Sequence, residues 1–128
     1  MNKQLNGATA QAACTRYRGV KRGAGARQVT PITALTDFPV GVVQNETVLS
    51  GNQVTIGNPV VLVYEGQCLA EAGAAIAAFQ EIQFGATGLV IPAVATGRRA
   101  GIALDAASGS GSIINIDLDC RVVGQVLA

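Results

Sequence analysis

Short apolar segments separated by turn-forming residues are the feature that most constrains the fold of this 128-residue chain. These segments recur roughly every 8–12 residues, the spacing typical of strands in all-β sandwiches and barrels. They cover residues 28–35, 40–44, 54–56, 60–64, 79–84, 88–94, 99–104 and 113–118. No long stretch carries its apolar residues at the helical period of about 3.6. The sequence therefore predicts an all-β fold, as a small β-barrel or a sandwich.

Three local features refine this prediction. Residues 17–21 alternate, and the glycines of residues 22–27 then interrupt the pattern, as the loop of a hairpin does. Pro31 lacks an N–H donor, so residues 28–35 are expected as an edge strand or an irregular crossing. Residues 70–78 are rich in alanine and are the one candidate helix, although Gly73 interrupts them and a loop is the alternative.

An internal pseudo-repeat relates residues 40–56 to residues 100–116 at an offset of sixty positions without a gap. Four positions are identical in the two segments: Gly41 and Gly101, Ser50 and Ser110, Gly51 and Gly111, Ile56 and Ile116. Each segment reads as a strand, a polar loop, a Ser-Gly turn and a second strand. We interpret the match as two segments with common structural roles.

Charge divides the chain into a basic leader and an acidic body. Six cations precede the first acid, Asp37, whereas the remainder has three arginines against eight acids. We therefore expect residues 1–27 to form an extended basic N-terminal arm and residues 28–128 to form the β domain. The candidate contact residues of this arm, for a capsid or another subunit, are Arg16, Tyr17, Arg18, Lys21, Arg22 and Arg27.

Contact with protein is the favoured role of the arm, since complementary charge steers association. A solvated arm that aids solubility is one alternative. Contact with nucleic acid is the other, but Tyr17 is the one aromatic residue of the segment that bases could stack on.

The chemistry that most enzymes need is missing from the sequence. The chain has no histidine, which excludes Ser-His-Asp and Cys-His arrangements and histidine-ligated metals. Cys14, Cys68 and Cys120 are far apart and are expected as reduced thiols. Asp117 and Asp119 share one face of a strand, which indicates a solvated face rather than a cation site. We expect no enzyme activity, cofactor, metal, small-molecule substrate or membrane span.

Most apolar residues are small, and aromatic residues make up 4% of the chain. Small side chains bury little area each, so further burial against neighbouring copies is expected.

The chain also resembles a known family of proteins. The resemblance is carried by Gly41-Val-Val-Gln-Asn-Glu46, Ser50-Gly-Asn-Gln-Val-Thr-Ile56, Val60-Val-Leu-Val63, Ala72-Gly-Ala-Ala-Ile76, Gly101-Ile-Ala-Leu-Asp-Ala-Ala107 and Gly111-Ser-Ile-Ile-Asn-Ile-Asp-Leu118. This pattern resembles that of the capsid cement, or head decoration, proteins of tailed bacteriophages. The resemblance covers residues from about Tyr17 to Leu118. The chain departs from the family at residues 79–81, where members often have a glycine before an acidic residue.

The resemblance implies a structural role in the virion. A cement protein is made in the host cytoplasm and binds the outer surface of the assembled major capsid protein lattice. There it acts commonly as a homotrimer that stabilises the head. A trimeric tail or spike component is the alternative.

Overall fold

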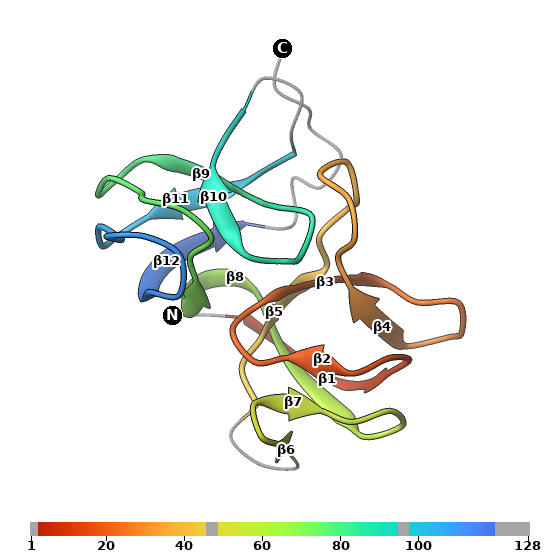
Figure 1. Cartoon of the computed structure of the whole chain (residues 1–128). Coiled ribbons are helices and arrows are strands. Elements are labelled where there is room, and N and C mark those ends of the chain that lie inside the picture. Colours follow the sequence, from red (N-terminus) through yellow and green to blue (C-terminus); the bar gives the residue numbers. More distant parts are fainter. Residues whose placement is uncertain (1–2, 46–48, 95–97, 120–128) are drawn as a thin grey trace.

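The computed structural model describes residues 3–45, 49–94 and 98–119, and within them the backbone is built of strands without a helix (Figure 1). The strands are β1 (Lys3–Ala10), β2 (Cys14–Thr15), β3 (Gly19–Arg22), β4 (Gln28–Pro31), β5 (Gly41–Val43), β6 (Leu49–Ser50), β7 (Gln53–Val54), β8 (Pro59–Glu71), β9 (Glu81–Phe84), β10 (Val90–Pro92), β11 (Arg99–Ala103) and β12 (Ile113–Asp119). The predicted all-β class is confirmed.

Five of these strands close into a small barrel. Their order is β1-β4-β3-β5-β8, and β1 closes the ring by pairing antiparallel with β8. The interior is filled by small apolar side chains, among them Ala8, Val20, Val43 and Leu62. The short sheet β2-β7-β6 adds Cys14 and Val54 to the same cluster, so the small sheet shares the core of the barrel.

Strand β8 is thirteen residues long and joins the two halves of one nine-stranded sheet: the barrel, and a second half that we call the second sheet. Its first half pairs with β1 and β5 in the barrel, whereas residues 65–71 pair with β12. Gly66 lies at the change of partner with a φ of 98°, a backbone conformation that glycine adopts at little cost. The second sheet continues as β8-β12-β11-β9-β10, and Figure 1 shows it above the barrel.

The second sheet has its own core, larger than that of the barrel. Ile82, Ile116 and Leu118 are fully buried there, and Phe84 is its one buried phenylalanine among the described residues. A Cβ atom on Gly19 would lie 2.6 Å from Cδ1 of Phe84, so the glycine makes room for the ring. Val42 and Val63 of the barrel strands reach into this core as well.

The expected division into an arm and a domain is wrong for the described part of the leader. Residues 3–22 supply strands β1, β2 and β3, and β1 pairs with both β4 and β8. The physical reason is that Ala8, Ala10 and Val20 are needed to fill the barrel, which no charge pattern reveals.

Two local predictions also change and one is confirmed. Residues 70–78 form no helix. Strand β8 continues to Glu71, and beyond it Ala72 and Ile76 form isolated β-bridges. Strand β4 is not an edge strand, since β1 and β3 flank it, and Pro31 lies beyond the residues that pair with β1. The hairpin around residues 22–27 is present, with Arg22 paired to Val29 across its base. None of the described residues lies in a helix that is long and apolar enough to cross a membrane.

Candidate interaction surface

The six predicted contact residues lie in β3 and in the two connections that precede and follow it. Arg16, Tyr17 and Arg18 connect β2 to β3, whereas Arg22 and Arg27 flank the loop of the β3–β4 hairpin. Lys21 lies within β3. The fold gives these residues three different environments. Two form ion pairs with acids of the domain, two stack on each other, and two are exposed.

Arg18 and Lys21 are neutralised within the domain. Nε of Arg18 lies 3.2 Å from Oε1 of Glu71, at the end of β8. Nζ of Lys21 lies 2.9 Å from Oδ2 of Asp37, in the loop between β4 and β5. Both pairs are partly buried, so these two cations hold the structure together and are poorly placed to attract a partner.

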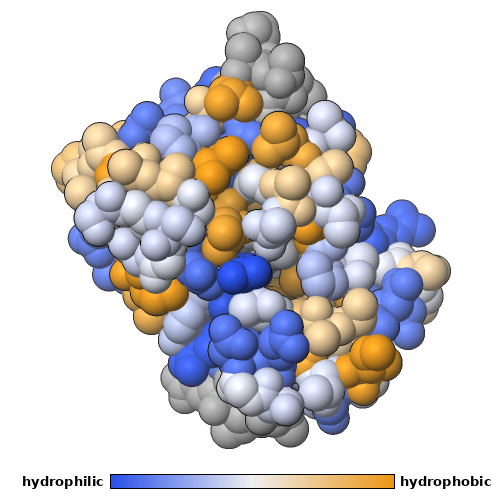
Figure 2. Space-filling view, in the orientation of Figure 1, coloured by the Kyte–Doolittle hydropathy of each residue, from blue (hydrophilic) through white to orange (hydrophobic). Residues whose placement is uncertain are grey.

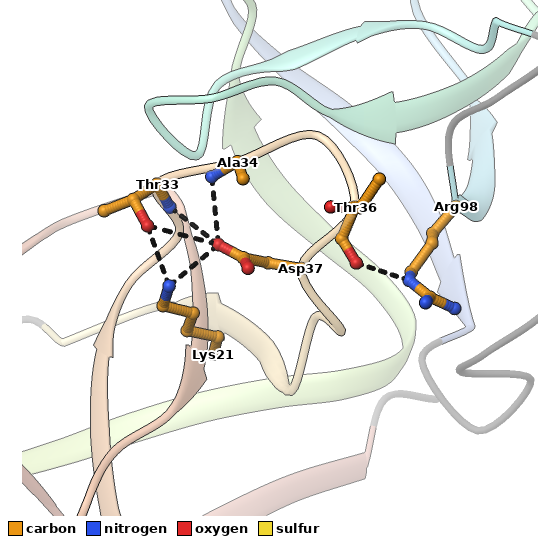
Figure 3. A network of polar contacts seen from close by, with 6 residues as sticks. All are labelled: Lys21, Thr33, Ala34, Thr36, Asp37 and Arg98. Carbon is orange, nitrogen blue, oxygen red and sulfur yellow. Dashed lines mark hydrogen bonds and ion pairs between the residues drawn. The ribbon is translucent and has the colours of Figure 1, made fainter.

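Asp37 organises the loop between β4 and β5, as Figure 3 shows. The backbone N–H groups of Thr33 and Ala34 each donate to its Oδ2 at 2.9 Å. Lys21 also donates to Oγ1 of Thr33 at 2.7 Å. Burial alone would raise the pKa of Asp37, but Lys21 and these two N–H groups together hold it below its ordinary value. The carboxylate is therefore a structural centre of this loop.

Arg16 and Tyr17 pack against each other in a tight turn. The Arg16 guanidinium carbon lies 4.5 Å from the centroid of the Tyr17 ring. Tyr17 has a φ of 68°, and its N–H donates to the carbonyl of Val43 at 2.8 Å. Its own carbonyl accepts from the N–H of Glu71 at 2.8 Å. The turn is therefore fixed between β5 and β8, and its two side chains are half-buried.

Arg22 and Arg27 differ from the other described cations. Both are exposed, and neither forms an ion pair in the part of the chain that the structure describes. They border a hollow of about 680 Å³ that we call the hairpin hollow. Its lining consists of Leu5, Ala8, Arg22, Ala24, Gly25, Ala26, Arg27, Gln28, Val29 and Val40. An apolar floor beside two uncompensated arginines suits an apolar side chain accompanied by carboxylates.

A second exposed feature was missed in the sequence. The Arg98 guanidinium carbon lies 3.6 Å from the centroid of the Phe38 ring, and Nε of Arg98 donates to the carbonyl of Thr36 at 2.6 Å (Figure 3). Phe38 is half exposed, at 50%. Phe38 and Arg98 lie just outside the two segments of the pseudo-repeat, and no sequence pattern predicts that they touch, so this contact is visible in the tertiary structure alone.

Exposed apolar residues are spread over the surface. On the face drawn in Figure 2, apolar side chains gather along the middle of the molecule, over the region of β10. Phe79, expected at the start of a strand, lies instead in the turn before β9 and is 72% exposed.

The remaining candidate groups are structural. Asp117 points from the exposed face of β12 and Asp119 is half-buried on the same face, and the described residues contain no cluster of three or more metal-ligating side chains. Cys14 and Cys68 are free thiols. Burial raises the pKa of Cys14 to about 11 and, with the nearby charge of Asp117, that of Cys68 to about 12. Cys120 lies outside the described residues.

Comparisons with known proteins identify a family for this chain. A family model described as phage cement protein matches residues 4–118. Among solved structures, the chain resembles the N-terminal base of the head fibre of bacteriophage phi29, with a TM-score of 0.67 at 17% identity. That match covers 94% of this chain and 96% of the other. No curated protein matches the sequence at a significant level.

Proposed function

This chain belongs to the phage cement protein family, and from that premise we propose that it binds the outer surface of the assembled major capsid protein lattice. It acts there as a homotrimer that stabilises the head. The observation that carries the proposal is the family match over residues 4–118, which spans all the strands of the two sheets except single terminal residues of β1 and β12. The fold that it shares with the base of the phi29 head fibre is compatible with a place on the virion exterior.

The surface chemistry supports contact with protein. Arg22 and Arg27 are exposed, unpaired within the described residues and next to an apolar hollow. The other four candidates contribute indirectly, since their contacts fix the turn and the strand that precede the hairpin: Arg16, Tyr17, Arg18 and Lys21. Many copies on one lattice make weak individual contacts effective.

Binding to purified capsids tests the proposal. The full chain is mixed with capsids assembled without it, and separately with purified tails, and each mixture is sedimented. We expect it to sediment with capsids and to raise the temperature at which they disrupt. The double variant R22Q/R27Q is expected to bind about tenfold or more weakly. The control K3Q removes one exposed cation from β1, outside the lining of the hollow, and should bind as the unmodified chain does.

The outcome also decides between the head and the alternative place on the virion. Sedimentation with tails and not with capsids would favour a trimeric tail or spike component. Binding to neither particle would refute both. Steeply salt-dependent binding to DNA would instead support the nucleic-acid interpretation.

A further inference from the structure

Phe79 is the most exposed large apolar side chain in the described part of the chain, at 72%. Its turn is well ordered by hydrogen bonds: the N–H of Phe79 donates to the carbonyl of Ala103 at 2.7 Å, and that of Ala77 donates to Oε1 of Gln80 at 2.9 Å. The φ of Phe79 is 64°, a region that bulky residues seldom adopt. The domain thus holds a phenyl ring outward, in water, at some cost.

The surface beside this ring carries both charges, because Arg99 as well as Glu81 lines the depression at Phe79. Phe79 and Glu81 line the same shallow depression, and Glu81 is exposed at the start of β9. Ile102 pairs with Glu81 on one side and with Asp117 on the other, which places both carboxylates in one row across the sheet. Asp105 is exposed two residues beyond Ala103. Arg99 offsets one of these charges through its ion pair with Glu81 at 2.5 Å.

The hairpin hollow has the complementary properties and lies on the other side of the molecule. It has an apolar floor, including Leu5, Val29 and Val40, and it has the two unpaired arginines at its border. In Figure 1 the β3–β4 hairpin extends to the right of the molecule, and the turn before β9 lies at the left. One copy therefore carries a projecting ring at one end and a receptive hollow at the other.

We propose that Phe79 of one copy inserts into the hairpin hollow of a second copy, with the exposed Asp117 facing Arg22 and Arg27. This inference names the contact that builds the homotrimer of the proposed function and rests on that proposal. Because the two surfaces differ, the contact is head-to-tail, and repeating it closes a ring when the rotation between neighbours allows it. A hollow of about 680 Å³ has room for a phenyl ring, which buries roughly 150–250 Å² on insertion.

Sedimentation velocity of the full chain at several concentrations tests this contact. The ring is removed by F79N, since asparagine tolerates a positive φ. The hollow is filled by A24W, or by R22E if that variant does not fold, and circular dichroism verifies folding. The matched control I56A truncates a side chain that is 71% exposed elsewhere. We expect the unmodified chain and I56A to form closed trimers, and F79N and A24W each to associate at least about tenfold more weakly.

Mixing the two defective variants gives the sharpest readout. F79N keeps an intact hollow and A24W keeps an intact ring, so a mixture forms one productive contact and stops at heterodimers. Trimers that survive F79N, or a mixture that stays monomeric, would overturn the inference. If A24W forms trimers but does not bind capsids, the hollow receives the capsid protein and the inference is again wrong. If trimers form only when Phe79 is present but do not bind capsids, the proposed function is refuted and the inferred contact between copies still stands.

Discussion

Two glycines related by the pseudo-repeat, Gly41 and Gly101, lie where a neighbouring strand comes too close for any side chain. A Cβ atom on Gly41 would lie 2.7 Å from the carbonyl oxygen of Val63, and one on Gly101 would lie 2.1 Å from that of Asp117. The turn glycines Gly51 and Gly111 also behave alike, with φ values of 65° and 95°. At the scale of single residues, the repeat therefore reports common backbone constraints.

Replacing Gly101 with alanine tests this constraint. The substitution should lower the free energy of unfolding by about 2–4 kcal/mol, because the new Cβ meets the Asp117 carbonyl and a φ of 151° is unfavourable for alanine. Urea unfolding measures the change. Gly109→Ala is the matched control, since no heavy atom lies within 4 Å of its Cβ position. Equal midpoints for the two variants would contradict the explanation.

Among the connecting elements, the loop between β4 and β5 is held by a single carboxylate. Asp37 joins Lys21 of β3 to the N–H groups of Thr33 and Ala34, and Arg98 contacts the same loop through Thr36 and Phe38. An isolated surface ion pair contributes little, but several bonds to one oxygen fix a loop more firmly. The loop therefore depends on the ionised form of Asp37.

The pH dependence of stability follows from that ionised form. The pKa of Asp37 is lower in the folded protein than in the unfolded chain, so its contribution is present above the unfolded value and is lost as pH falls through the folded value. D37N should destabilise the protein at pH 7, and the difference from the unmodified chain should shrink below about pH 4. D117N makes the same charge change on an exposed strand. A difference in the free energy of unfolding between D37N and the unmodified chain that stays constant with pH would refute this role.

At the scale of the whole molecule, strand β8 connects two cores, and we expect them to unfold together. Leu62 is buried in the barrel, Cys68 is buried in the second sheet, and one strand carries both. Val42 and Val63, from β5 and β8, contribute to the second core. Loss of the barrel should therefore remove a partner strand from β12.

Truncating Leu62 tests this coupling. Leu62→Ala leaves a cavity in the barrel and should cost about 2–5 kcal/mol. We expect amide groups of β11 and β12 to lose hydrogen-exchange protection by the same amount as those of β3 and β5. Leu35→Ala, at a side chain that is 40% exposed, should change neither set appreciably. Protection of β12 that stays at the level of the unmodified chain would show that the halves unfold separately.

The sequence by itself determined most of the strand segments beyond the leader, the hairpin at residues 22–27 and the glycine turns, because alternation and turn chemistry act over a few neighbouring residues. It also pointed to Arg22 and Arg27 among its basic candidates. It did not determine that the leader closes a barrel, because the pairing of β1 with β8 joins residues about fifty or more positions apart. Nor did it separate the exposed arginines from Arg18 and Lys21, whose charges are cancelled by acids that only the tertiary structure brings near. Exposure and charge pairing are properties of the packed chain, and the contact surface that we propose depends on both.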